Sequence, residues 1–105
     1  MAIITQDYGS VNGGGRPFTK NQKYTNYTIS AGTSTLTFDD FTNISLVEIW
    51  WCPWNEAVVY YFDDSNQLQK IGDFHSTVNS IEGNQINITM GNGWEGTYNI
   101  AIVGE

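Results

Sequence analysis

Apolar and polar residues alternate along most of this chain, and this two-residue period limits its fold more than any other feature. Residues 86–90 read INITM and residues 98–102 read YNIAI. Successive side chains of a β-strand point to opposite faces of a sheet, so each pattern predicts a strand with one apolar face. Clusters of Gly, Asn and Asp separate these segments, as tight turns require. The sequence therefore predicts an all-β protein of seven to eight antiparallel strands, folded as a β-sandwich or jelly-roll-like domain.

The composition indicates one small β domain preceded by an arm. The chain has 105 residues, enough for one domain with its own core. Only 14% of them are charged, against about 25% in an average domain, and many Asn, Thr, Ser and Gly residues take their place. We assign residues 24–105 to the β-sandwich and residues 1–23, with the linker Gly13–Gly15, to a flexible N-terminal arm. The arm is either frayed or docked on a neighbouring subunit, through the contact residues Ile3, Ile4 and Tyr8.

The most apolar segment runs from residue 44 to residue 54 and holds three of the four tryptophans. Its strand is apolar on both faces at its far end, which is typical of a central strand or of one with a β-bulge. Trp50 and Trp51 are adjacent, so they point to opposite faces and cannot both enter one core. Either both faces of this strand are covered, or one tryptophan lies at a surface that binds something. Pro53 has no backbone N–H donor and ends the strand.

These aromatic residues are the best candidate for a binding site. Flat aromatic rings pack against the C–H faces of sugars, while amide and carboxylate groups hydrogen-bond sugar hydroxyls. The predicted ligand-binding set is Trp50, Trp51, Trp54, Asn55, Glu56 and Tyr61. The alternative is that the tryptophans form part of the core and a contact between subunits. Trp94 lies on a predicted turn and is expected to cover one end of the sandwich rather than to contact a ligand.

Catalytic and metal sites are not expected. Cys52 and His75 are the only pair that suggests nucleophilic catalysis, but Cys52 lies in an apolar strand, where cysteine behaves as a small hydrophobe. Asp39–Asp40 and Asp63–Asp64 offer the oxygen ligands that calcium prefers, yet Asp also favours turns by bonding nearby backbone amides. We expect turn roles for both pairs, and the sequence leaves calcium binding open. No catalytic residue, metal ligand or cofactor is assigned.

The charge and the termini narrow the choice of partner and compartment. A net charge of −7, with only four Lys and Arg residues, argues against nucleic acid and membrane surfaces as partners. The first residues lack the basic and apolar regions of a signal peptide, and no apolar run is long enough to span a bilayer. The single cysteine cannot form an internal disulfide. We therefore expect synthesis in the cytoplasm without a signal peptide.

Three segments, together with the Asn- and Thr-rich body, resemble small β-rich structural and accessory proteins of bacteriophages and prophages. They are residues 3–9 (IITQDYG), Gly13–Gly15 and residues 93–100 (GWEGTYNI). The resemblance implies a virion component, such as a tail, fibre or capsid accessory protein, that forms a homo-oligomer or binds other virion proteins. It implies no catalytic residues.

Two hypotheses about function follow from these observations. The first is a non-enzymatic structural or assembly module of a virion, which uses the N-terminal arm and the aromatic patch to contact like subunits. The alternative is a carbohydrate-binding module that uses the aromatic residues around Trp54 to hold a glycan. An enzyme is a distant third, because no catalytic group of residues is present in the pattern.

Overall fold

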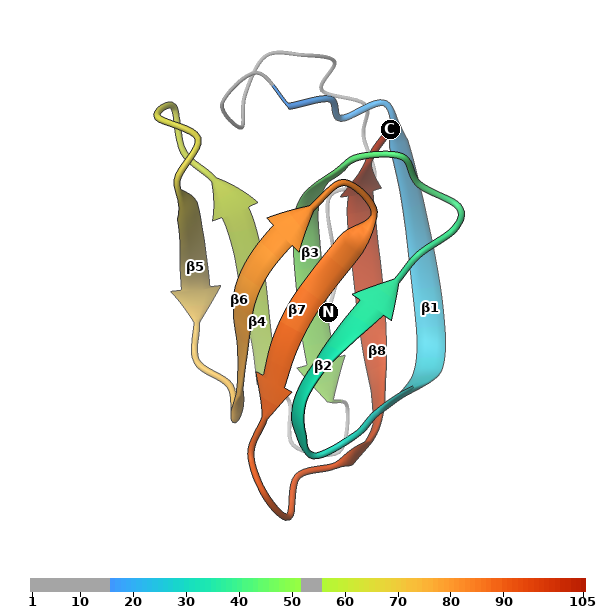
Figure 1. Cartoon of the computed structure of the whole chain (residues 1–105), viewed down its shortest axis with the longest axis vertical. Coiled ribbons are helices and arrows are strands. Elements are labelled where there is room, and N and C mark those ends of the chain that lie inside the picture. Colours follow the sequence, from blue (N-terminus) through green and yellow to red (C-terminus); the bar gives the residue numbers. More distant parts are fainter. Residues whose placement is uncertain (1–15, 52–55) are drawn as a thin grey trace.

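The computed structural model describes residues 16–51 and 56–105, which form a β-sandwich of eight strands (Figure 1). The predicted all-β fold is therefore confirmed, and no helix occurs in this described part of the chain. The strands are β1 (Lys20–Ile29), β2 (Gly32–Thr37), β3 (Ile44–Trp51), β4 (Glu56–Phe62), β5 (Leu68–Gly72), β6 (Ser76–Glu82), β7 (Gln85–Met90) and β8 (Gly96–Gly104).

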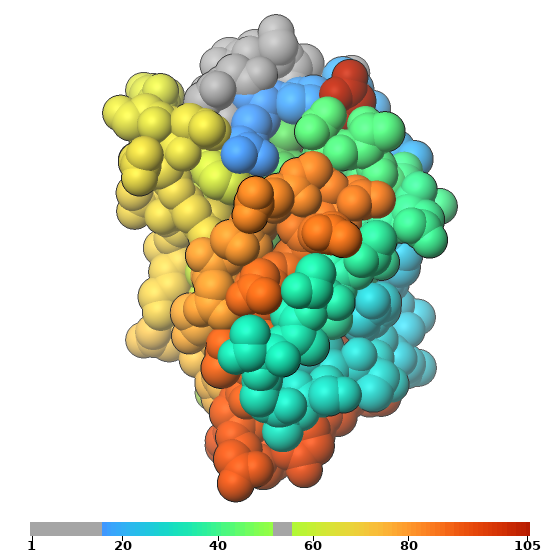
Figure 2. Space-filling view, in the orientation of Figure 1, coloured from blue at the N-terminus to red at the C-terminus, as the bar shows by residue number. Residues whose placement is uncertain are grey.

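The strands form two antiparallel sheets. The larger sheet has five strands in the order β1-β8-β3-β4-β5, and the smaller has three in the order β2-β7-β6. Every neighbouring pair is antiparallel. Figure 1 shows the three-stranded sheet lying across one face of the five-stranded sheet, and Figure 2 shows it forming the front surface of the molecule. We call the opposite face of the five-stranded sheet its outer face.

The main core lies between the two sheets and is built by the alternation seen in the sequence. On β7, Ile86, Ile88 and Met90 point into this core and are buried, while the intervening Asn87 and Thr89 are partly exposed. On β8 the same parity sends Tyr98, Ile100 and Ile102 inward. Burial of each large apolar side chain contributes roughly 1.5–3 kcal/mol, so this layer supplies much of the driving force for folding. The strands contribute to it Ile29, Leu36, Val47, Ile49, Val58, Tyr60, Phe62, Val78, Ile81, Ile86, Ile88, Met90, Tyr98, Ile100 and Ile102.

Strand β1 begins at Lys20, four residues before the predicted start of the sandwich at residue 24. Residues 20–23 pair with β8, in a register that runs from Lys20↔Gly104 to Lys23↔Ala101. Their polar composition groups them with the arm, but an edge strand tolerates exposed polar and charged side chains. The sandwich therefore includes the end of the segment 1–23. The arm's predicted contact residues lie outside the described residues: Ile3, Ile4 and Tyr8.

Strand β3 is buried on both faces, as its doubly apolar sequence predicts. Val47 and Ile49 belong to the core between the sheets. By the same parity, Leu46, Glu48 and Trp50 point to the outer face, where Trp50 is only 7% exposed. The strand lies between β8 and β4, and its pairing with β8 shifts register near its start. Both faces of the central strand are thus covered, which is the first of the two alternatives that the adjacent tryptophans allowed.

Glu48 is the one charged residue at the centre of the outer face. It pairs with Ala101 of β8 on one side and with Val59 of β4 on the other. The charged group nearest to it in this row is Lys23 of β1, which lies beyond Ala101. The Glu48 side chain is fully buried, and neither of its carboxylate oxygens has a hydrogen-bond partner among the described residues. Loss of solvation disfavours the charged form and raises the pKa of Glu48 to about 7.

The raised pKa of Glu48 predicts a pH-dependent stability. Between about pH 4.5 and pH 7 the folded protein keeps a proton that the unfolded chain releases, so the free energy of unfolding falls as the pH rises. The total loss that corresponds to the shift from 4.5 to about 7 is about 3 kcal/mol. Residue 48 stays neutral at every pH in Glu48→Gln. Denaturant titrations should therefore show a free energy of unfolding that depends less on pH than that of the wild type and that is larger than the wild-type value at pH 8.

Glu82→Gln is the matched control, because it removes an exposed carboxylate on β6. Its pH profile should follow that of the wild type. If the free energy of unfolding of Glu48→Gln changes with pH between 4.5 and 8 as that of the wild type does, Glu48 does not have the raised pKa.

Candidate functional site

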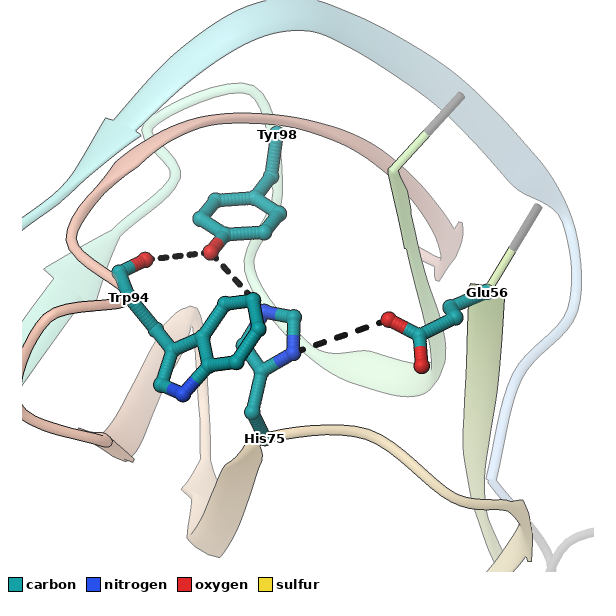
Figure 3. Close-up of polar contacts among 4 residues, drawn as sticks. All are labelled: Glu56, His75, Trp94 and Tyr98. Atoms are coloured by element: carbon teal, nitrogen blue, oxygen red, sulfur yellow. Dashed lines mark hydrogen bonds and ion pairs between the residues drawn. The ribbon is translucent and has the colours of Figure 1, made fainter. Parts of the chain in front are cut away.

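Several aromatic side chains meet at the end of the sandwich where β3 ends and β4 begins. They come from β3, from the connection between β5 and β6, from the turn between β7 and β8, and from β8 itself. We call this group the aromatic cluster; it consists of Trp51, Phe74, His75, Trp94 and Tyr98. Figure 3 shows three of its members with the neighbouring carboxylate of Glu56.

His75 lies at the centre of the aromatic cluster, between two parallel rings. Its imidazole stacks on Phe74 with ring centroids 4.1 Å apart and on Trp94 at the same separation, with interplanar angles of 27° and 15°. The ring of Trp51 is nearly perpendicular to both, with its centroid 5.9 Å from that of the imidazole and 6.0 Å from that of the Trp94 ring. Stacked and edge-to-face pairs of this kind add roughly 0.5–1.5 kcal/mol each beyond simple burial. The cluster is therefore a tightly packed unit.

A chain of polar contacts fixes the orientation of the imidazole (Figure 3). The hydroxyl of Tyr98 donates to the backbone carbonyl of Trp94 and lies 2.9 Å from Nε2 of His75. Because that hydroxyl has one proton, it accepts from His75, which places the proton of the neutral imidazole on Nε2. The other ring nitrogen, Nδ1, lies 3.8 Å from Oε1 of Glu56. Glu56 therefore faces the atom that gains a proton when His75 becomes charged.

The turn that carries Trp94 is held by its own hydrogen bonds. Gly91 donates its N–H to the carbonyl of His75 at 3.1 Å, and Trp94 donates to the carbonyl of Gly91 at 3.0 Å. Gly93 has a φ of +90°, which favours glycine, and its N–H donates to Oε1 of Glu95 at 2.9 Å. A Cβ on Gly91 would lie 3.1 Å from Cδ1 of Trp94, so the indole packs closely against this glycine. Trp94 is thus presented by an ordered turn.

The charges that act on the aromatic cluster are negative. Burial lowers the pKa of His75, and the charge of Glu56 opposes this shift. Burial also raises the pKa of Tyr98, with smaller contributions in the same direction from Glu56 and Glu95. The cluster is therefore neutral at pH 7 and is bordered by two carboxylates.

Trp94 is the exposed member of the cluster. The residue is 43% exposed even though one face of its ring is stacked on His75. Glu56 lies beside the stack and is about half exposed. The arrangement offers a flat apolar surface with a hydrogen-bond acceptor next to it. A surface of this kind is suited to contact with another molecule.

The four described members of the predicted ligand-binding set lie in two separate places. Trp51 and Glu56 form the last cross-strand pair of β3 and β4 and lie at the aromatic cluster. Trp50 and Tyr61 point to the outer face instead, where Trp50 is buried and Tyr61 packs beside Phe18 and Leu46. The cause is strand parity, which separates neighbouring residues between two faces. Trp54 and Asn55, as well as Cys52, lie outside the described residues.

His75 and Trp94 are the site residues that the sequence prediction missed. Trp94 does cover the sandwich end, but it also keeps a large exposed surface. His75 stands out in the sequence only as a candidate partner of Cys52, yet it supports the exposed indole. The signal in the sequence is the pair of glycines at positions 91 and 93, which mark a tight turn immediately before a tryptophan.

One carboxylate of each acidic pair makes hydrogen bonds: Asp63 within its turn, and Asp40 between its loop and strand β1. Oδ1 of Asp63 accepts hydrogen bonds at 2.9 Å from the backbone N–H groups of Ser65 and Gln67, and Oδ2 accepts one from the side chain of Gln69. The bond from Gln67 is the main cause of a lowered pKa at Asp63. Oδ2 of Asp40 accepts a hydrogen bond from the Tyr24 hydroxyl at 2.8 Å. These carboxylates thus stabilise local structure.

Comparisons with protein-family models, curated proteins and solved structures found no match to this chain. Within residues 16–51 and 56–105, no helix has the length and apolar character needed to cross a membrane. The same residues contain no group of three or more His, Cys, Asp or Glu side chains placed to hold a metal ion.

The contact between Glu56 and His75 predicts a change in pKa. Glu56→Gln removes the charge that opposes desolvation, so the pKa of His75 should fall further below its ordinary value. His75 is the single histidine, so an NMR titration of its imidazole resonances measures this pKa without ambiguity. The lowered pKa also means that stability is fully present above pH 6.5 and declines as the pH falls through the folded-state pKa.

Glu82→Gln again serves as the control, since its carboxylate lies on exposed β6. A wild-type His75 pKa above 6.5, or one that Glu56→Gln leaves unchanged, would show that the described contact does not act on the imidazole.

Proposed function

We propose that this protein is a non-enzymatic binding module and that the exposed indole of Trp94 is its platform for an uncharged sugar ring. The observation that carries the proposal is the combination of a 43% exposed tryptophan with a rigid support of stacked rings beneath it. Most exposed side chains lose rotamer freedom when they bind. Here the packing has already fixed the ring, which lowers the entropy cost of binding.

The chemistry around Trp94 favours a neutral carbohydrate over a charged ligand. The apolar C–H face of a sugar packs on the free face of the indole, and its hydroxyls donate to the carboxylate of Glu56 beside the stack. Glu56 and Glu95 both carry negative charge near the cluster, so phosphate, sulfate and acidic sugars are disfavoured. The net charge of −7 acts in the same direction.

The shape of the cluster also disfavours a small organic cation. Quaternary ammonium ions bind in open cages of several aromatic rings. The centre of this cluster is filled by the imidazole of His75, which stacks on Phe74 and Trp94. The surface that remains for a ligand is a single flat face, which fits a sugar ring.

A structural or assembly role in a virion is the second candidate function. The observation in its favour is Ile71, a large apolar residue that is 63% exposed at the edge of the outer face. It lies opposite Val59 on β4, so it extends an apolar row toward solvent where a like subunit would bind. The resemblance to phage proteins remains a prediction, and it rests on the sequence alone.

The proposal predicts a defined loss of binding in Trp94→Ala. An array of bacterial surface polysaccharides and simple neutral sugars, followed by calorimetric titration of any hit, measures the affinity. Trp94→Ala should weaken binding at least about tenfold, or roughly 1.4 kcal/mol, while Trp94→Phe keeps part of the affinity. Ile71→Ala is the control, because it removes another large exposed apolar side chain, on a different face of the molecule.

The outcomes separate the two candidate functions. If Trp94→Ala is folded and binds the same glycan as tightly as the wild type, Trp94 is not the sugar-binding surface. If no glycan binds the wild type and Ile71→Ala dissociates an oligomer, the assembly function takes its place.

A further inference from the structure

Strand β2 lies at one edge of the three-stranded sheet, and β7 is the one described strand that pairs with it. Figures 1 and 2 show β2 at the surface of the molecule. Phe38, the residue after β2, donates its N–H to the carbonyl of Asn84 at 3.0 Å. Hydrogen-bonded pairs alternate along an antiparallel ladder, so every second residue of β2, counted back from Phe38, bonds to β7. The residues between them point their backbone N–H and C=O groups to the free edge: Thr33, Thr35 and Thr37.

The other three edge strands each carry a feature that opposes pairing with another chain. Strand β1 has two lysines and a break in its register after Tyr24. Strand β5 is only five residues long and contains Lys70, and the register of β6 is broken after Val78. Charges, short strands and bulges are the means by which folded proteins prevent edge-to-edge association. Strand β2 has no charged residue and no proline, and all six of its residues pair with β7 without a shift.

We propose that the free edge of β2 binds β2 of a second copy of this chain, in an antiparallel pair with its two-fold axis at Thr35. Thr35 then lies opposite its own copy, and Thr33 lies opposite Thr37 of the second copy. These are the residues whose backbone groups point to the free edge, so each opposed pair exchanges main-chain hydrogen bonds. The two three-stranded sheets join into one continuous sheet, and the same surface of each copy forms the contact.

The side chains of the free-edge residues fit this pairing. All three are exposed threonines on one face of the sheet, so a pair about Thr35 places threonine opposite threonine throughout. Such cross-strand pairs stabilise a sheet. Their positions are already ordered, because Oγ1 of Thr33 lies 2.8 Å from Oγ1 of Thr89 and the side-chain amide of Asn87 donates to Oγ1 of Thr35 at 3.3 Å. Side chains that are held in place before association lose less entropy when a second copy binds.

The charge distribution around β2 also allows two copies to approach. A net charge of −7 opposes self-association in general. The neighbouring strand β7 has no charged residue, and the nearest carboxylates along the chain follow β2 at Asp39 and Asp40. An antiparallel pair about Thr35 places these two residues beside Ser30 and Ala31 of the second copy, which are uncharged. Like charges therefore do not meet across the axis.

The proposed contact is separate from the sugar platform. Gly32, at the start of β2, pairs with Met90, which immediately precedes the turn that carries Trp94. An antiparallel pair of β2 strands therefore places the two Trp94 side chains at opposite ends of the joined sheet. Ile71 lies on β5 of the other sheet, so the contact is also distinct from that exposed apolar residue.

Charge substitutions at Thr35 test the pairing. Sedimentation equilibrium of the full-length protein, over a concentration series that reaches the millimolar range, should show a monomer–dimer equilibrium. Thr35→Lys and Thr35→Glu each place like charges opposite one another, so each variant alone should weaken the dimer about fivefold or more. An equimolar mixture of the two variants should restore it, because the mixed dimer has opposite charges at the same place. Thr77→Lys is the matched control, since it adds a charge at an exposed threonine of the edge strand β6 and should leave the dimer unchanged.

Several outcomes of this experiment would overturn the proposal. A wild type that stays monomeric through the whole series leaves the edge open to water or to a strand of another protein. A dimer that Thr35→Lys leaves unchanged, or that Ile71→Ala dissociates, forms through a different surface. A dimer that each variant weakens but that the mixture does not restore shows that Thr35 does not lie opposite its own copy.

Amide hydrogen exchange in the wild type provides a second measurement that needs no substitution. Over the concentrations at which the dimer forms, the N–H groups of Thr33, Thr35 and Thr37 should exchange more slowly as the protein concentration rises, because pairing bonds them. The N–H groups of the edge strand β5 should exchange at the same rate at every concentration. If the exchange of Thr35 does not depend on concentration in this range, β2 does not pair with a second copy.

Discussion

Strand β3 is apolar on both faces, and the two layers of this protein depend on that property. One face of β3 supplies Val47 and Ile49 to the core between the sheets. The other supplies Leu46 and Trp50 to the outer face. Hydrogen bonds to β4 and β8 hold the strand in the middle of the larger sheet, so neither face can turn to water without exposing large side chains. The position of β3 therefore determines which residues of the other strands are buried.

The parity of the same strand also decides which tryptophan is available for binding. Trp50 points to the outer face and is buried there. Trp51 points to the opposite face at the last position of the strand, where it meets His75 and Trp94. The exposed indole thus rests on a stack anchored in the core, and Tyr98 ties that stack to β8. Glu48 shows the energetic cost of this arrangement, because its carboxyl group lies in an apolar layer and has no hydrogen-bond partner in the part of the chain that the structure describes.

Much of the fold could be predicted from the sequence, because strand parity is a local property. The alternation in residues 86–90 and 98–102 identifies the inward side of β7 and β8. The two adjacent tryptophans left two alternatives open, and the structure shows a strand buried on both faces. The start of β1 was harder to predict, because the polar residues 20–23 fit a flexible arm as well as they fit an edge strand. The aromatic cluster could not be predicted, because strand order brings together His75 and Trp94 from separate connections. A local sequence pattern carries no information about the order of the strands in a sheet.

Native-state hydrogen exchange measured by NMR tests the central role of β3 most directly. Amide groups in the middle of β3, from Leu46 to Ile49, should exchange only through global unfolding, because both neighbouring strands and both covered faces protect them. Amides of the edge strand β5 should exchange faster, through local opening. If the amides of β3 exchange as fast as those of β5 while the protein remains folded, then β3 is not the buried centre of the sandwich.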